Sequence, residues 1–190
     1  MKTQWRQRAL EARAQRDPNS YTQSCNALLQ HLSTLLQSAP RCTVALYYPV
    51  RGEPDLLPLL NDSSLKHLSW ALPVCVDQGD DAHLAFHAHE AGAPLAPGRY
   101  GIPVPAKAQE VQPQILLIPC VGFDRSGARL GYGAGWYDRT LARLATPVQT
   151  IGVAFSDAEI SQPFAQAHDR LLDCIVTDRE VIGEFRPPVF

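Results

Sequence analysis

Three alternating glycines lie in a stretch whose residue types could bind phosphate. They are Gly131, Gly133 and Gly135, within Arg129-Leu-Gly-Tyr-Gly-Ala-Gly-Trp-Tyr-Asp138. Glycine adopts positive φ and lets a ligand approach the backbone without an intervening Cβ. An apolar run precedes this stretch and a helical pattern follows it, so the turn would expose backbone N–H groups at a helix N-terminus. We therefore expect a phosphate-binding turn here.

Two charged residues flank the glycines and extend this expectation. Arg129 carries a planar guanidinium that suits phosphate oxygens, and Asp138 could hold Mg²⁺ in the first helical turn. The alternative is a tight structural loop in which Asp138 only stabilises the positive end of the helix dipole. The spacing matches neither a Walker loop nor the Rossmann fingerprint, so the motif alone leaves both interpretations open.

A second group of charges lies at the N-terminus. Residues 3–15 have helical composition, and at 100° per residue Lys2, Arg6 and Arg13 fall within about 40° of one another. Three cations in a row could clamp a polyphosphate, whereas the alternative is a solvated basic face. The neighbouring apolar stripe, which would anchor this helix, consists of Trp5, Ala9 and Ala12.

The elements that would position these groups alternate along the chain. Helices are predicted over 3–15, from an N-cap at Ser20 to about 37, over 55–60 and over 135–144. Strands are predicted at 43–48, 70–76, 83–89, 115–118, 148–155 and 174–177, and a long proline-rich connection spans 78–114. This order predicts an α/β fold: a three-layer sandwich with a mostly parallel, Rossmann-like sheet and helices on both faces.

Composition limits the function classes. The 190 residues fit a single domain over 1–190, and a net charge of −2 gives no general attraction to nucleic acid or to a membrane surface. Neither a signal peptide nor a membrane-spanning run is expected. The five scattered cysteines, 25, 42, 75, 120 and 174, indicate free thiols in a reducing compartment, and hence a cytoplasmic protein.

The glycine-rich segment resembles the long motif of the 5-formyltetrahydrofolate cyclo-ligase family, also called methenyltetrahydrofolate synthetase. The long motif spans Pro119 to Asp138, and weaker matches occur in the family's order over most of the chain. They are Lys2 and Arg6, Tyr48 followed by Glu53, Tyr100-Gly101-Ile102-Pro103, Ile151 to Phe155, His168-Asp169, and Ile175-Val176-Thr177.

This resemblance implies the positions of the ligands. ATP would contact Lys2, Arg6, Arg129, Gly131, Tyr132, Gly133, Ala134, Gly135, Trp136 and Tyr137, with catalytic roles for Arg129 and Tyr137. The Mg²⁺ ligands would be Asp138 and Asp169. The folate substrate would contact Tyr48, Glu53, Tyr132, Gly133 and Trp136.

The implied reaction converts 5-formyltetrahydrofolate to 5,10-methenyltetrahydrofolate with release of ADP and phosphate. ATP would phosphorylate the formyl oxygen, and N10 would then attack the resulting iminophosphate. The cofactors would be ATP and Mg²⁺, and the partner a small-molecule reduced folate. We expect a monomer that binds neither nucleic acid nor membranes.

Three positions depart from the family pattern. Val104 stands where a Glu is frequent, Glu159 where a Gln is frequent, and Ala134 where Lys or Gly is common. The departure at Val104 leaves open an ATP-dependent enzyme that acts on a related formamide. A non-catalytic nucleotide- or folate-binding protein on the same scaffold is a further alternative.

Three histidines close in sequence form one more candidate. His83, His87 and His89 would point the same way on a strand, so a metal site is conceivable, and a polar strand face is the alternative.

Overall fold

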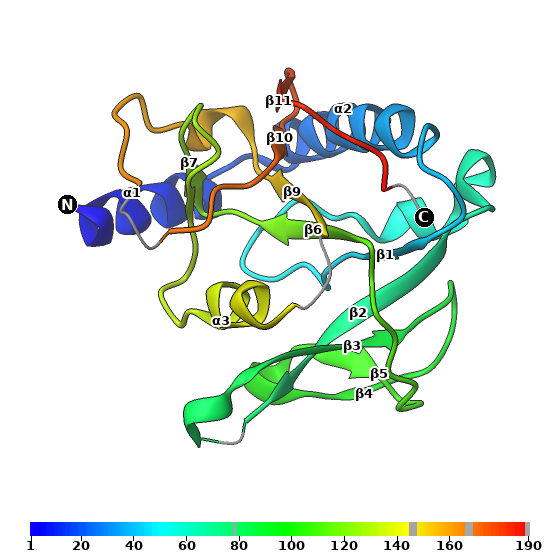
Figure 1. Cartoon of the computed structure of the whole chain (residues 1–190). Helices are drawn as coiled ribbons and strands as arrows, with labels where there is room; N and C mark the ends of the chain where they lie inside the picture. The colour runs from blue at the N-terminus through cyan, green and yellow to red at the C-terminus, as the bar shows by residue number, and fades with distance from the viewer. Residues whose placement is uncertain (78, 145–147, 166–168, 189–190) are drawn as a thin grey trace.

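The structure, a computed structural model, describes residues 1–77, 79–144, 148–165 and 169–188 (Figure 1). Its α-helices are α1 (Lys2–Ala14), α2 (Pro18–Leu36) and α3 (Trp136–Arg143). Short 3₁₀ helices are η1 (Leu57–Asn61), η2 (Ser63–Leu65), η3 (Gly79–Asp81), η4 (Arg99–Gly101) and η5 (Ser156–Ala158).

Seven strands form one sheet in the order β11-β10-β9-β6-β1-β2-β3. Their bounds are β1 (Thr43–Ala45), β2 (Ser69–Val76), β3 (His83–Ala88), β6 (Ile115–Pro119), β9 (Gln149–Val153), β10 (Cys174–Val176) and β11 (Val181–Gly183). The five inner strands are parallel, and β3 and β11 run antiparallel at the two edges. The mostly parallel α/β fold predicted from the sequence is confirmed.

Strand β6 shows why helices cover both faces of this sheet. Alternate residues of a strand point to opposite faces. Ile115 and Leu117 pack in the cluster that contains the apolar side of α2, whereas Leu116 and Ile118 pack in the cluster that contains Leu141 of α3. Figure 1 accordingly shows α2 and α3 on opposite sides of the sheet. A strand buried on both faces reads as a continuous apolar run, as β6 does.

The chain order creates a switch point between β1 and β6. From β1 the chain proceeds outward to β2 and β3, and then returns to β6 on the other side of β1. In open α/β sheets, ligands bind beyond the carboxyl ends of the strands at such a point. The segment that follows β1 carries Glu53, and the segment that follows β6 leads to the glycine loop, residues 129–138.

Local details differ from the sequence predictions: the strand predicted at 43–48 ends at Ala45, and the edge strand β11 was not predicted. Helix α2 begins at Pro18 and not after Ser20, because the Asp17 carboxylate accepts hydrogen bonds from the N–H groups of Asn19 and Ser20. Aspartate is a strong N-cap and proline is favoured at the first helical position. The proline-rich connection contains a small hairpin, β4 (Leu95–Pro97) with β5 (Pro103–Pro105), in addition to the predicted strand β3.

Two further expectations concern thiols and membranes. All five cysteines are free, as predicted. Within the described ranges, no helix combines the length and the apolar character needed to cross a bilayer.

Candidate functional site

A hairpin that the sequence analysis missed leads into the glycine loop. Strands β7 (Gly122–Phe123) and β8 (Arg129–Leu130) pair antiparallel around a turn built by Asp124. One Asp124 oxygen accepts from the Ser126 N–H at 2.9 Å, and the other accepts from the Phe164 N–H at 3.1 Å. The Asp-Arg-Ser-Gly sequence of this turn was the available signal. The hairpin sets the position of Arg129 at the start of the loop.

Arg129 is held in place on both sides of its guanidinium. Its side chain is only 7% exposed and forms an ion pair with the Asp138 carboxylate. Its Nη1 donates to the carbonyl oxygen of Arg170 at 3.1 Å, next to Asp169. One guanidinium therefore brings Asp138 close to the backbone beside Asp169, so the two predicted metal ligands belong to the same region.

Asp169 forms an ion pair with Lys2. Lys2 Nζ lies 2.7 Å from Asp169 Oδ2, which joins the start of α1 to the segment after the last 3₁₀ helix. Each predicted metal ligand thus neutralises a predicted phosphate-binding cation in this structure. His168, which was matched to the family together with Asp169, lies outside the described residues.

Arg6 contacts the glycine loop directly. Its Nε donates to the Gly131 carbonyl at 2.7 Å, and its guanidinium lies against Gly133. Gly133 has φ +95°, and a Cβ there would lie 3.4 Å from Arg6 Cζ, so both backbone conformation and space favour glycine. Arg6 and the loop are therefore brought together as the sequence predicted.

Arg13 does not share the surface position of the other two helix cations. It is 7% exposed, and its Nη2 donates to the Cys120 carbonyl at 2.7 Å at the carboxyl end of β6. Its Nη1 donates to Tyr132 Oη at 3.3 Å. Its donors therefore face protein acceptors, which sequence spacing alone did not reveal.

The apolar anchor of α1 also differs from the predicted stripe. Ala12 is exposed, whereas Trp5 packs on Phe164 with ring centroids 5.8 Å apart. The cationic face of the helix, and not Ala12, turns toward the body of the protein.

Glu53 follows β1 in a tight turn with unusual backbone angles. The Glu53 N–H donates to the Val50 carbonyl, and the two central residues, Arg51 (φ +50°) and Gly52 (φ +71°), are both left-handed. Glycine tolerates this region, whereas arginine is strained in it. The turn directs the Glu53 side chain into the protein, where it is only 2% exposed.

Both oxygens of the buried Glu53 carboxylate accept hydrogen bonds. Tyr132 Oη donates to Oε1 at 2.9 Å, and the Val50 N–H donates to Oε2 at 2.9 Å. Burial raises the pKa of Glu53, although these two donors and the charges of Arg13 and Arg51 partly offset the rise. Glu53 and the glycine loop, predicted to share a substrate, are thus in direct contact.

The aromatic residues of α3 differ in environment. Arg99 and Arg139 lie over the Trp136 ring at 5.4 and 5.2 Å, and Trp136 Nε1 is buried without an acceptor among the described residues. Burial, followed by the charge of Glu53, raises the pKa of Tyr137, so its hydroxyl stays protonated at neutral pH. Tyr137 can therefore donate a hydrogen bond and is no general base at that pH.

The remaining predicted site residues are Gly135, Ala134 and Tyr48. Gly135 adopts φ +69° as the N-cap of α3, and the exposed Ala134 accepts from Arg139 Nη1 at 3.0 Å through its carbonyl. Tyr48 is half-buried after β1.

In the part of the chain that the structure describes, no group of three or more His, Cys, Asp or Glu could hold a metal ion, so His83, His87 and His89 form no such site.

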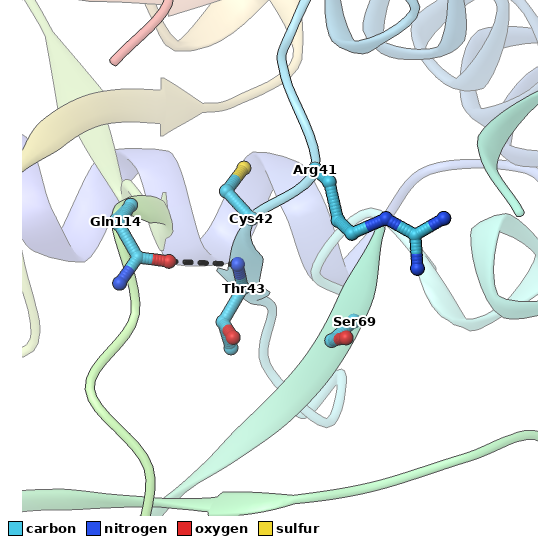
Figure 2. A pocket seen from close by; sticks show the side chains of 5 residues that line it. All are labelled: Arg41, Cys42, Thr43, Ser69 and Gln114. Carbon is cyan, nitrogen blue, oxygen red and sulfur yellow. Dashed lines mark hydrogen bonds between the residues drawn. The ribbon is translucent and has the colours of Figure 1, made fainter. Parts of the chain in front are cut away.

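A shallow depression lies at the opposite end of the sheet. Figure 2 shows its lining, Arg41, Cys42, Thr43, Ser69 and Gln114, at the amino ends of β1, β2 and β6. The Thr43 N–H donates to Gln114 Oε1 at 2.8 Å, so these polar groups satisfy each other. It includes none of the predicted site residues.

We predict that Arg13→Met lowers the free energy of unfolding by about 2–4 kcal/mol, because it removes a donor from the buried Cys120 carbonyl and a cation from the surroundings of Glu53. Urea denaturation would measure this change. Arg8→Met, on the exposed side of the same helix, is the control and should change stability by no more than about 0.5 kcal/mol. Equal effects of the two substitutions would contradict a structural role for Arg13.

We predict that Glu53→Gln gains stability relative to the wild type as pH rises from 4 to 8. The folded-state pKa of Glu53 is raised, so the wild type loses stability as pH rises through that pKa, whereas glutamine does not ionise. Urea titrations at several pH values would measure the difference between the two proteins. A difference that is flat, or that changes in the opposite direction, would show that the hydrogen bonds to Glu53 outweigh its burial.

Comparison with known proteins shows the family of this chain. The sequence model of the 5-formyltetrahydrofolate cyclo-ligase family matches residues 1–178. A relative from Mycolicibacterium smegmatis with the name 5-formyltetrahydrofolate cyclo-ligase is 32% identical over 151 residues, which are 76% of this chain and 77% of that protein.

Two solved structures resemble the fold. The Aquifex aeolicus 5,10-methenyltetrahydrofolate synthetase has a TM-score of 0.80 and 28% identity, with 100% of this chain and 96% of that chain covered. The Mycoplasma pneumoniae 5,10-methenyltetrahydrofolate synthetase has a TM-score of 0.74 over 93% of this chain and 98% of that chain, and its 24% identity supports the fold alone. With a glycine loop joined to α1 and to Glu53 at the switch point, the chain belongs to the 5-formyltetrahydrofolate cyclo-ligase family.

Proposed function

We propose that this protein converts 5-formyltetrahydrofolate to 5,10-methenyltetrahydrofolate in a reaction that requires ATP and Mg²⁺. The observation that carries this proposal is the arrangement of the glycine loop. The loop contacts Arg6 on one side and the buried Glu53 on the other, so a segment that is suited to phosphate adjoins a carboxylate in a protein of this family.

The nucleotide would bind between α1 and the loop. Lys2, Arg6 and Arg129 supply positive charge there, and a Cβ at Gly131 would meet open space, which leaves room for a ligand close to the backbone. Loop N–H groups and the N-terminus of α3 would add donors for phosphate oxygens. We assign the ATP contacts to these three cations and to residues 131–137.

The residues present fit a magnesium ion. Asp138 and Asp169 offer the oxygen ligands that Mg²⁺ prefers, and nucleotide phosphates complete its shell in enzymes of this kind. The ion, when bound, would offset phosphate charge. Arg129 and Lys2, which now pair with the two carboxylates, would then be available for phosphate oxygens. The 63% exposed side chain of Asp138 is accessible for this exchange.

The folate would lie on the Glu53 side of the loop. We assign its contacts to Tyr48, Glu53, Tyr132, Gly133 and Trp136. The Glu53 carboxyl group can accept from N–H groups of a pterin, and the indole N–H of Trp136, which has no acceptor among the described residues, can donate to a substrate oxygen. A buried donor without a partner is costly, so a ligand acceptor there would be stabilising.

These positions suit a phosphoryl transfer followed by ring closure. An N5-formyl amide is a poor electrophile, and transfer of the γ-phosphoryl group to the formyl oxygen would make an iminophosphate. N10 would then attack the formyl carbon, and phosphate would leave. Arg129 and Lys2 would offset the charge, and the protonated hydroxyl of Tyr137 would donate to a phosphoryl oxygen. No protein nucleophile is needed for this sequence.

One observation favours a second candidate, an ATP-dependent enzyme for a related formamide. Val104, where the family often has glutamate, lies on β5 opposite Ala96, so this position offers no carboxylate to a substrate. ADP release from a panel of reduced folates and formamides would separate the two enzymes. A non-catalytic binding protein on this scaffold would instead bind folate tightly without turnover and without a response to Mg-ATP.

We predict that the purified protein with Mg-ATP and 5-formyltetrahydrofolate forms a methenyl product that absorbs in the near ultraviolet. Asp138→Ala should lower kcat/KM by about 100-fold or more, because it removes a metal ligand from a charged transition state. Asp157→Ala is the matched control, since Asp157 is also paired with an arginine and 59% exposed but lies outside the proposed site. An inactive wild type would overturn the proposed activity, and a fully active Asp138→Ala would overturn the metal role alone.

We also propose that the whole chain acts as a cytoplasmic monomer that binds a small-molecule reduced folate, without a nucleic acid or membrane partner. The five free thiols support a reducing compartment. Size-exclusion chromatography with light scattering should give a mass near 20.9 kDa, and twice that mass would show a dimer.

A further inference from the structure

Tyr132 lies between the two proposed ligand positions: its hydroxyl contacts Glu53, and its two neighbours in the chain contact Arg6. Its hydroxyl donates to Glu53 Oε1 at 2.9 Å on the folate side. Its two neighbours in the chain, Gly131 and Gly133, contact Arg6 on the nucleotide side, Gly131 through a 2.7 Å hydrogen bond. A displacement of this one residue would therefore alter the contacts at both positions.

Three groups contact the Tyr132 side chain: the Glu53 carboxylate, the Arg13 guanidinium and the Arg51 guanidinium. Arg13 Nη1 donates to its hydroxyl at 3.3 Å, and the Arg51 guanidinium lies 5.4 Å from the ring centroid. Arg13 is itself buried against the Cys120 carbonyl, so it cannot follow a movement of the loop. The position of the Tyr132 hydroxyl and the position of the glycine loop therefore depend on each other.

The hydrogen bond from Tyr132 to Glu53 is energetically important because the carboxylate that accepts it is buried. A hydroxyl that donates to a carboxylate in a low-dielectric site forms a strong, charge-assisted hydrogen bond, and its loss would leave the buried carboxylate short of a donor. Each carboxylate oxygen has two lone pairs, so Glu53 can accept from a ligand and keep Tyr132 at the same time.

We propose that Tyr132 is a positioning residue that couples the two sites, so that binding of the reduced folate at Glu53 raises the affinity of the glycine loop for Mg-nucleotide, and the reverse. A ligand on either side fixes one end of the same hydrogen-bonded unit and thereby lowers the ordering cost for the other ligand. This inference rests on the proposed function, from which both ligand positions are taken.

Isothermal titration calorimetry can measure this coupling. The dissociation constant of 5-formyltetrahydrofolate would be measured without and with a saturating, non-hydrolysable Mg-ATP analogue, and the experiment repeated with the ligands exchanged. We expect the wild-type affinity for each ligand to rise by about 5-fold or more when the other is present, by the same factor in both directions. We expect this factor to fall to about 1–2 in Tyr132→Phe, which keeps the ring over Arg51 and removes only the hydroxyl.

Tyr21→Phe is the matched control. Tyr21 Oη donates to the backbone carbonyl of Glu53 at 2.8 Å, so it supports the same residue through a bond that involves no residue of the glycine loop. It should keep the wild-type coupling factor. If Tyr132→Phe fails to fold, as judged by its thermal unfolding, Arg13→Lys offers a second test. Lysine keeps the positive charge, but its side chain is shorter and withdraws the donor that orients the Tyr132 hydroxyl. This variant should also lower the coupling factor.

The possible outcomes separate the two levels of inference. A wild-type coupling factor of 1, an unchanged factor in Tyr132→Phe, or an equal fall in Tyr21→Phe would each overturn the role of Tyr132, even in an active enzyme. Absence of binding of either ligand to the wild type, together with absence of the methenyl product, would instead overturn the proposed function. A fall confined to the variants that affect the Tyr132 hydroxyl would support the coupling.

Discussion

The buried guanidinium of Arg13 determines the arrangement of this site. It binds the Cys120 carbonyl at the carboxyl end of β6 and the hydroxyl of Tyr132, and so attaches α1 to the sheet and to the glycine loop. A buried cation is costly unless its donors are satisfied, so the helix has few alternative positions. Lys2 and Arg6 project from the same helix, and their contacts with Asp169 and Gly131 therefore depend on this anchor.

The sheet supplies the second constraint. Its central strands β6 and β9 are buried on both faces. The sheet holds the ends of β1 and β6 side by side, while the loops beyond those ends are free to carry polar groups. Glu53, placed by a turn with a left-handed arginine, then meets Tyr132 from the loop that follows β6. Backbone strain at such a turn persists only when surrounding contacts determine it, and the two hydrogen bonds to Glu53 are such contacts.

The sequence allowed most of the fold to be predicted because hydrophobic patterning is local. The run at 115–118 and the apolar side of α2 need no tertiary information to be recognised. The glycine loop, Arg6 and Glu53 were also found, and their mutual contacts agree with the family resemblance. The assignment of ligands to individual residues stays a prediction, because it depends on molecules that the sequence only implies.

The parts that were missed depend on contacts between distant segments. Arg13 has the same helical spacing as Lys2 and Arg6, and only its distance from Cys120, 107 residues away in sequence, distinguishes a buried anchor from a surface cation. The β7–β8 hairpin has two-residue strands, which are too short for a periodic signal. At the start of α2, two acceptable N-caps compete, and Asp17 prevails because Pro18 follows it.

The five cysteines have a chemical consequence beyond their packing. Burial raises the pKa of every one of these thiols, to about 11 for Cys120 and about 12 for Cys174. Since the thiolate is the form that reacts with oxidants and alkylating agents, the raised pKa values lower the reactivity of these thiols at neutral pH. Cys120, whose carbonyl anchors α1, thus contributes a backbone acceptor to the site while its own buried thiol stays protonated at neutral pH.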